Sequence, residues 1–173
     1  MTITIRQENA NDRDEVYNVV KSSFENEAFS DHDEHNLVNR LRKSTAFIPQ
    51  LSLVAECENK IVGYILFTEI KVGDACLLAL APVSVLPEMQ GKGIGKQLII
   101  EGHKIASQLG YKGCVVLGHD KYYPKFGYKR ASHYHIEAPF EVPDECFMAI
   151  EFEEGSLSGV QGTVEYAKEF FEN

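Results

Sequence analysis

The chain is short of positive charge: 17 lysine and arginine residues face 26 aspartate and glutamate residues, and the formal net charge is −9 at pH 7. DNA and anionic membrane surfaces attract basic patches, so this balance argues against nonspecific binding to either and favours cationic partners. No run of about 18 apolar residues occurs, and Met1–Arg6 lacks a basic region followed by a long apolar stretch. The sequence therefore predicts a cytoplasmic protein with no membrane span and no nucleic-acid partner.

Paired cysteines are also missing. Cys57, Cys76, Cys114 and Cys146 lie far apart in the sequence, and none belongs to a Cys-x-x-Cys pair. Each falls in a segment whose apolar pattern is typical of a strand, so we expect four reduced, buried thiols. Reduced thiols agree with a cytoplasmic location.

Repeats, low-complexity tracts and a dividing linker are absent as well. A length of 173 residues suits one domain with a substantial core. His32 and His35 stand three positions apart beside several acids, but no further ligand motif accompanies them. We therefore expect a single domain, residues 1–173, without a metal site.

The most informative segment is Gln90–Gly95, which reads Gln-Gly-Lys-Gly-Ile-Gly and lies between an extended apolar run and a helical pattern. Its three glycines permit positive φ angles and close backbone approach. Backbone N–H groups can then line a concavity at the positive end of the following helix, where phosphate oxygens bind well. The segment therefore predicts a pyrophosphate site.

Two better-known phosphate-binding patterns are not matched. A Walker loop needs Ser or Thr after Gly-Lys, but Gln97 follows Gly95-Lys96. The dinucleotide fingerprint needs its third glycine one position later and an acid about 20 residues further on, near the place where Tyr111 stands. Nucleoside triphosphates, NAD and FAD are therefore disfavoured.

Gln90–Gly95 resembles the Gln/Arg-x-x-Gly-x-Gly loop of the GCN5-related N-acetyltransferase (GNAT) family, in which this loop cradles the pyrophosphate of acetyl-CoA. Val83–Pro87 is similar to the family's fourth strand and strand-to-helix bend, and Tyr122–Tyr128 looks like its Tyr-x-x-x-Gly-Phe segment. The resemblance covers residues 76–130. Leu117-Gly118-His119 before Tyr-Tyr-Pro is further similar to a poorly characterised bacterial branch of the family.

Hydrophobic periodicity predicts alternating strands and helices. Turns at Asn59-Lys60 and Gly73-Asp74 make an antiparallel meander, and Gly110 closes a helix. The fold class is α/β, with a mixed, mostly antiparallel central sheet flanked by helices, and the resemblance adds a splayed parallel strand pair that forms the acyl-CoA cleft. The predicted strands are Thr2–Arg6, Leu51–Glu58, Ile61–Val72, Cys76–Val85, Cys114–Leu117, Tyr128–Glu137, Cys146–Phe152 and Gly162–Tyr166, and the predicted helices are Asp12–Phe24, His35–Lys43, Ile94–Leu109 and Tyr122–Phe126.

The resemblance implies an acetyl-CoA site along this cleft. Backbone groups of Val83 and Val85 would pair with pantetheine like an added strand, and an N–H near Val83 would reach the thioester oxygen. Pro82, which has no N–H, fits a disrupted ladder beside them. Lys92 and Lys96 would meet phosphates or else remain solvated. The expected cofactor contacts are Val83, Val85, Gln90, Gly91, Lys92, Gly93, Ile94, Gly95 and Lys96.

Tyr123 is the expected catalytic residue, because it stands four residues before Gly127, at the family's position for a hydroxyl that stabilises the leaving thiolate. Tyr122 is expected to pack the short helix against the sheet. No carboxylate lies between Cys76 and Val85, where many family members place or water-link a base. Glu69, His119 and a water relay therefore remain alternatives for the base.

An acidic segment between Lys21 and Arg40 carries five carboxylates and no lysine or arginine. In the family this region often borders the acceptor site, so its charge could attract an amine cation. The alternative is a helix start, where acids are favoured. The five residues are Glu25, Glu27, Asp31, Asp33 and Glu34.

These features predict an acetyl-CoA-dependent N-acetyltransferase that moves the acetyl group directly to a small-molecule or peptide amine in a ternary complex. The alternatives are a noncatalytic acyl-CoA-binding or sensing domain and a phosphate-loop nucleotide binder. The sequence leaves open the amine, the range of acyl groups, and the choice between monomer and homodimer.

Overall fold

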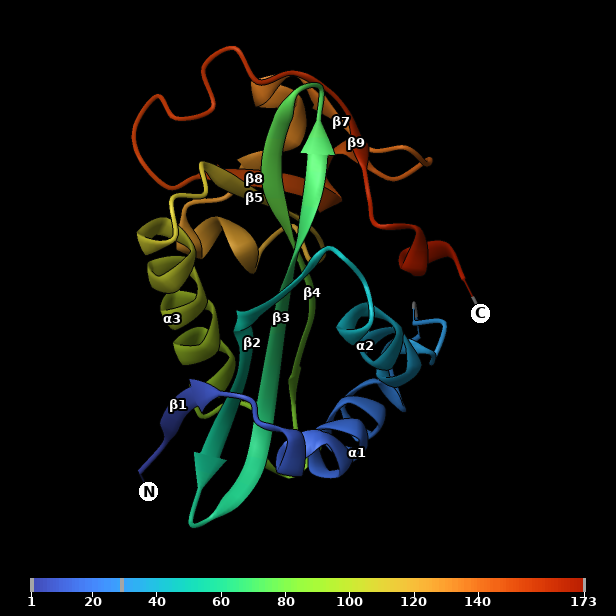
Figure 1. Ribbon diagram of the computed structural model, residues 1–173, viewed down its shortest axis with the longest axis vertical. Helices are drawn as coiled ribbons and strands as arrows, with labels where there is room; N and C mark the ends of the chain where they lie inside the picture. The colour runs from blue at the N-terminus through green and yellow to red at the C-terminus, as the bar shows by residue number, and fades with distance from the viewer. Residues whose placement is uncertain (1, 29, 173) are drawn as a thin grey trace.

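The computed structural model describes residues 2–28 and 30–172, which fold around a twisted mixed sheet (Figure 1). The strand order is β1-β2-β3-β4-β5-β8-β6, and β9 joins the far end of β3 and pairs with β7. Of the described strand pairs, β4–β5 and β7–β9 are parallel and the others antiparallel. The strands are β1 Thr4–Gln7, β2 Phe47–Cys57, β3 Lys60–Val72, β4 Ala75–Val85, β5 Gly113–Leu117, β6 Lys129–Arg130, β7 Ile136–Glu137, β8 Phe147–Glu151 and β9 Gly162–Glu165.

Three α-helices, α1 (Arg13–Phe24), α2 (Glu34–Arg42) and α3 (Ile94–Gln108), flank this sheet within the described residues. Figure 1 shows α3 on one side of the β2–β3–β4 meander and α1 with α2 on the other. Side chains alternate along β3 accordingly. Ile65 and Phe67 belong to the core beneath α3, whereas Tyr64 and Leu66 belong to the core beneath α1 and α2. The predicted fold class is confirmed.

Helix α3 lies close to the sheet because glycines leave it room. A Cβ on Gly102 would stand 2.2 Å from Cε1 of Phe67, and one on Gly63 would stand 3.1 Å from Cγ2 of Ile94. A larger residue at either position would push the helix away from β3. The tight contact therefore fixes where α3 begins, and with it the glycine loop.

The meander turns fall close to their predicted positions. Glu58 and Asn59 both have positive φ angles, 52° and 63°, so the first turn is centred one residue earlier than the predicted Asn59-Lys60. Positive φ at both central residues is the geometry that a two-residue hairpin favours. Gly73, at φ 59°, starts the second turn as predicted, and Gly110, at φ 93°, ends α3.

Strand β4 is irregular where the sequence predicted a disrupted ladder. Leu80 pairs with Phe67 and Val83 pairs with Ile65, so two β4 residues, Ala81 and Pro82, lie opposite a single residue of β3. This is a β-bulge. The parallel pairing of β4 with β5 consists of Leu78 with Cys114 and Ala79 with Val115. Beyond Ala79 the two strands part, which is the predicted splayed pair.

The C-terminal part differs most from prediction. The predicted strand Tyr128–Glu137 is wrong, because a 3₁₀ helix at Ala131–Tyr134 separates β6 from β7 and His135 takes a left-handed conformation. Cys146 is also not in a strand but ends a 3₁₀ helix, Asp144–Cys146. Cys57 and Cys114 are buried, whereas Cys76 and Cys146 are partly exposed, and all four thiols are free.

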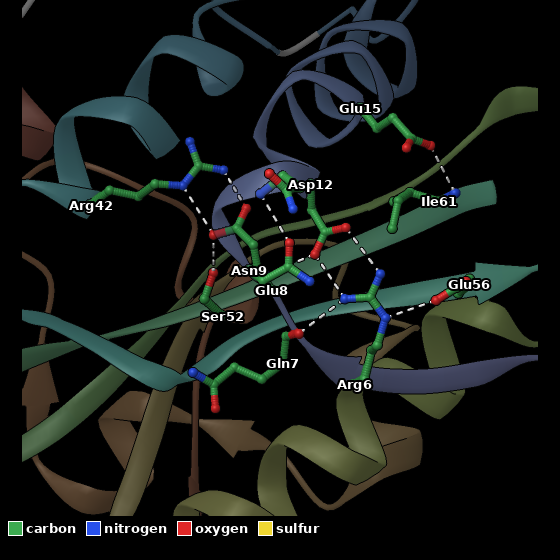
Figure 2. Close-up of polar contacts among 11 residues, drawn as sticks. Arg6, Gln7, Glu8, Asn9, Asp12, Glu15, Arg42, Ser52, Glu56 and Ile61 are labelled. Atoms are coloured by element: carbon green, nitrogen blue, oxygen red, sulfur yellow. Dashed lines mark hydrogen bonds and ion pairs between the residues drawn. The ribbon is translucent and has the colours of Figure 1, made fainter. Parts of the chain in front are cut away.

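Polar contacts fasten β1 and the two N-terminal helices to the sheet (Figure 2). Arg42 of α2 forms an ion pair with Glu8, and these side chains are only 6% and 4% exposed. Ser52 of β2 donates to Glu8 at 3.0 Å and shares a 2.6 Å hydrogen bond with Tyr64 of β3. Arg6 joins Asp12 at the start of α1. The face of the sheet opposite α3 is thereby covered by fixed helices.

Within residues 2–28 and 30–172, no helix is both long enough and apolar enough to cross a membrane.

Candidate active site

The glycine loop follows β4 through a short 3₁₀ helix, Pro87–Met89, and leads directly into α3. Gly91 and Gly93 have positive φ angles of 77° and 81°, which side-chain-bearing residues rarely adopt. A Cβ built on either glycine would meet no heavy atom within 4 Å, so the loop surface faces open space. The first turn of a helix leaves backbone N–H groups without helical partners. The loop can therefore present N–H donors to an anion.

The predicted cofactor contacts around the loop differ in which atoms they can offer to a ligand. Gln90 donates from Nε2 to the carbonyl of Val85 at 3.2 Å, which ties the loop to the end of β4. Lys92 and Lys96 are exposed on either side of Gly93. Ile94 is only 1% exposed and lies in the core beneath α3, so its backbone alone is available to a ligand.

Strand β4 supplies the next part of the site. Val83 and Val85 pair with Ile65 and Gly63 of β3, and their side chains pack against the core beneath α3. Past Ala79 the other edge of β4 has no pairing with β5. An unpaired strand edge can accept an extended ligand as an added strand. The structure thus leaves free the edge that the cofactor arm was predicted to use.

Tyr123 begins the 3₁₀ helix η3 (Tyr123–Phe126), and Pro124 sits in its first turn. The ring is 7% exposed and makes T-shaped contacts with Tyr122 and Tyr128, at centroid distances of 5.1 and 5.6 Å. Burial raises the pKa of its hydroxyl, and the nearby Tyr122 and Cys114 raise it further. Tyr123 therefore remains a neutral O–H donor at ordinary pH and is a poor proton acceptor.

Tyr122 packs against the core beneath α3, as predicted, and its hydroxyl makes a further approach that was not predicted. Its ring packs edge-on to Tyr123 and Phe126, but its hydroxyl points to the start of α3. A Cβ on Gly95 would stand 3.2 Å from that hydroxyl. No sequence pattern indicates this contact, because the two residues are 27 positions apart and meet only through the fold.

The structure separates the two side chains considered for the base. Glu69 accepts a 2.5 Å hydrogen bond from Tyr111, which lies just beyond the C-terminal end of α3, opposite the end that carries the glycine loop. His119 follows β5 in an exposed position, and its backbone carbonyl accepts from the N–H of Tyr122. His119 therefore lies next to the start of η3, whereas Glu69 is bonded to a residue beyond the C-terminal end of α3.

Two buried hydroxyls on the opposite face of the sheet were not predicted. Ser84 of β4 and Thr68 of β3 are 1% and 0% exposed, and neither hydroxyl has a hydrogen-bond partner among the described residues. Ser84 stands between Val83 and Val85, opposite Tyr64. Isolated Ser and Thr residues in apolar strands carry no sequence pattern that marks them.

Three of the five acids in the acidic segment accept hydrogen bonds from neighbouring residues. Asp33 accepts hydrogen bonds from Asn36 at 2.8 Å and Arg40 at 2.9 Å, and these contacts lower the pKa of its carboxyl. Asp31 accepts from the N–H of Asp33, and Glu34 accepts from Ser30 at 2.5 Å. These three acids therefore support the start of α2.

Glu25 and Glu27, by contrast, are exposed. Glu25 borders a cavity of about 210 Å³ between the end of α1 and the start of α2. The cavity is lined by Lys21, Phe24, Glu25, His32, Glu34 and His35.

Aromatic side chains that follow β9 gather with Phe140, and Phe170 among them packs against the core beneath α1 and α2. Tyr166 stacks on Phe140 at a centroid distance of 6.0 Å and contacts Phe170 at 5.0 Å. Phe140 and Phe171 remain 39% and 63% exposed. Arg40 of α2 donates to the carbonyl of Glu169 at 3.1 Å, which ties this aromatic segment to the acidic segment.

Comparison with known proteins agrees with this geometry. Residues 49–130 match the acetyltransferase (GNAT) domain family. The chain is 37% identical over 132 residues to YjhQ of Escherichia coli K12, an uncharacterized N-acetyltransferase, and the match covers 72% of this chain and 73% of YjhQ. It is 29% identical over 154 residues to YhbS of the same organism, also an uncharacterized N-acetyltransferase, covering 88% of this chain and 89% of YhbS.

Solved structures give the same relationship. The crystal structure of E. coli YhbS in complex with CoA superposes with a TM-score of 0.88 at 28% identity, covering 98% of this chain and 92% of YhbS. A GNAT family acetyltransferase from Brucella melitensis in complex with acetyl-CoA superposes with a TM-score of 0.82 at 34% identity, covering 98% of each chain. Fold and sequence together define an N-acetyltransferase. More specifically, the chain belongs to the GNAT family, as its motifs predicted.

Proposed function

We propose that this chain binds acetyl-CoA in the parted strands and transfers the acetyl group directly to an amine in a ternary complex. The observation that carries the proposal is that the open glycine loop follows directly on β4, whose edge past Ala79 is not paired with β5. Tyr122 reaches the start of α3 beside this loop, and the neighbouring ring of Tyr123 packs against that of Tyr122. The relatives solved with CoA and acetyl-CoA support the choice of ligand.

Each part has a defined task. Backbone N–H groups of Gly91–Gly95 hold the diphosphate, aided by the positive end of α3 and by Lys92 and Lys96. The free edge of β4 beside Val83 and Val85 holds the pantetheine arm and directs the thioester towards Tyr123. Because the glycine loop offers room and unpaired donors, the residues present fit the ligand.

The acetyl step is a nucleophilic substitution at the thioester carbonyl. The amine nitrogen forms the new C–N bond, the C–S bond breaks, and the electron pair leaves with sulfur as the CoA thiolate. Tyr123 donates a hydrogen bond to that sulfur as charge develops. The raised pKa of its hydroxyl means that it stabilises the thiolate without giving up its proton.

The amine also has to lose a proton before or during attack. An amine with a lysine-like pKa of about 10.4 costs roughly 4.6 kcal/mol to deprotonate at pH 7. His119 beside the parted strands, or a water relay, is the proposed acceptor of this proton, whereas Glu69 is held by Tyr111 at the far end of α3. No acyl-enzyme is required.

The acceptor approaches from the side of the sheet that carries α1 and α2. Exposed Glu25 and Glu27 give this side negative charge, and Phe140 and Phe171 offer aromatic surface. A small-molecule or peptide amine that carries positive charge suits these features.

The test is a thiol-release assay with acetyl-CoA and a panel of amines that includes polyamines, amino sugars and peptide N-termini. We expect amine-dependent release of CoA with at least one class, and no acetylated protein mass when acetyl-CoA is supplied without an amine. Tight binding of acetyl-CoA with no amine-dependent release would instead support the noncatalytic acyl-CoA-binding or sensing alternative.

A further inference from the structure

Tyr122 reaches from η3 across to the glycine loop. A Cβ on Gly95 would stand 3.2 Å from the Tyr122 hydroxyl and 3.8 Å from Cγ2 of Val85. The end of β4, the first turn of α3 and the start of η3 therefore meet around one phenolic oxygen. The end of β4 and the first turn of α3 flank the glycine loop of the proposed diphosphate site.

The ring that carries this hydroxyl is held firmly. It makes T-shaped contacts with Tyr123 at 5.1 Å and with Phe126 at 5.3 Å. Burial raises the pKa of the hydroxyl, so it remains a neutral donor. The hydroxyls of Tyr64, Tyr111 and Tyr128 each have a side-chain partner, whereas that of Tyr122 has none within residues 2–28 and 30–172.

The charge around this hydroxyl favours an anion. The ammonium of Lys125 lies 5.9 Å from the centroid of the Tyr122 ring, and Lys92 and Lys96 are exposed on the loop opposite. Lys125 thus lies beside the ring of Tyr122, and Lys92 and Lys96 belong to the loop and first helical turn that its hydroxyl approaches, in a chain whose formal net charge is −9. A phenolic O–H beside lysines and helix-start N–H groups suits a phosphate oxygen better than it suits a neutral amide.

We propose that Tyr122 is a cofactor-binding residue whose hydroxyl donates a hydrogen bond to the diphosphate of CoA. The diphosphate site then has two walls, the glycine loop on one side and η3 on the other. This assignment rests on the proposed binding of acetyl-CoA at Gly91–Gly95. It also explains the glycine at position 95, because a side chain there would displace the hydroxyl from the site.

The experiment compares wild type with Tyr122→Phe, which keeps the ring and its aromatic contacts and removes only the hydroxyl. Dissociation constants are measured by calorimetry for CoA and for adenosine 3′-phosphate 5′-diphosphate, which keeps the diphosphate but lacks pantetheine. We expect Kd to rise about ten- to a hundredfold for both ligands, the range for losing one hydrogen bond to a charged group. Tyr134→Phe, a partly buried tyrosine packed in the C-terminal core, is the matched control and should leave both constants unchanged.

Three other outcomes would overturn the assignment. Unchanged Kd values for Tyr122→Phe would show that the hydroxyl makes no contact that matters for binding. A rise for CoA alone would place the contact on pantetheine and not on the diphosphate. If wild type itself bound no CoA, the proposed function would fail, and the assignment would fail with it.

Discussion

The ring of Tyr123 occupies the space that a side chain at Gly118 would need. A Cβ built on Gly118 would lie 2.4 Å from Cε2 of that ring, closer than real Cβ atoms approach, and 3.1 Å from Cδ2. Gly118 follows the end of β5, so the absence of a side chain there fixes how near the tyrosine comes to the parted strands.

Replacing Gly118 with alanine should therefore move Tyr123. Because the hydroxyl must reach the departing sulfur, we expect Gly118→Ala to lower kcat about tenfold or more while the Kd for CoA changes less than twofold. In a Tyr123→Phe background the same substitution should cost little further. Fully additive losses in kcat, measured in the double mutant, would show that the two residues act independently.

A second prediction concerns Gly95, which differs from the other two glycines of the loop. Gly91 and Gly93 have positive φ angles, so substitutions there strain the backbone whatever space is available, whereas Gly95 lies within α3. Gly95→Val should raise the Kd for CoA at least tenfold, about 1.4 kcal/mol, by filling the site and displacing Tyr122.

The control for this prediction is the circular dichroism melt. A folded Gly95→Val protein that binds CoA like wild type would reject the placement of the diphosphate. Gly93→Val should lose both affinity and stability, because it adds backbone strain of roughly 1 to 3 kcal/mol.

The acidic segment yields a prediction that separates its members. Glu25→Gln with Glu27→Gln should raise KM for the amine, leave KM for acetyl-CoA unchanged and weaken the salt dependence of kcat/KM, because these exposed carboxylates attract a cation over about 8 Å at physiological ionic strength. Asp33→Asn should mainly lower the melting temperature, because it removes the ion pair to Arg40. Unchanged kinetics in the double Gln variant would remove the segment from the acceptor site.

We expect the free energy of unfolding to depend on pH because of the buried His103 of α3. Its ring packs against Phe67, Tyr128 and Phe152, and this burial lowers the pKa of the imidazole from 6.5 to about 4. In the unfolded chain His103 takes up a proton below pH 6.5, while the folded protein resists it until about pH 4. The folded state should therefore lose up to about 3 kcal/mol as pH falls through this window.

Denaturant unfolding at several pH values within that window tests this expectation against His103→Gln. The variant should show a shallower loss of stability as pH falls, and the difference between the two proteins should stop growing below about pH 4. Parallel curves for the two proteins would show that His103 is not the group responsible.

The backbone geometry of the glycine loop and of β4 could be predicted because it is local in sequence. Gln90–Gly95 needs glycines at fixed spacing before a helix, and the structure places that helix at Ile94 with positive φ at Gly91 and Gly93. Pro82 indicated an irregularity in β4, because proline has no N–H to donate to the ladder, and the structure has a bulge there. Backbone requirements of this kind restrict which residue types can occupy a position, so they can be recognised in the sequence.

The parts that were missed depend on contacts distant in sequence. The sequence around Tyr122 indicates a packing aromatic, and only the fold shows that its hydroxyl lies near Gly95. In the same way, only the fold shows that Glu69 accepts a hydrogen bond from Tyr111. The predicted strand Tyr128–Glu137 is wrong because a 3₁₀ helix at Ala131–Tyr134 and the left-handed conformation at His135 break it. No periodicity signals such a break.

The most direct test of the account is the rate of amine-dependent thiol release by Tyr123→Phe and Tyr122→Phe at saturating acetyl-CoA, with an amine found in the panel. The account predicts that Tyr123→Phe lowers kcat about ten- to a thousandfold with nearly unchanged Kd for acetyl-CoA, because it removes a donor used as the thiolate forms. Tyr122→Phe should do the reverse, raising Kd with a smaller effect on kcat. Equal, small effects on kcat in both variants would contradict the claim that Tyr123 assists the leaving group.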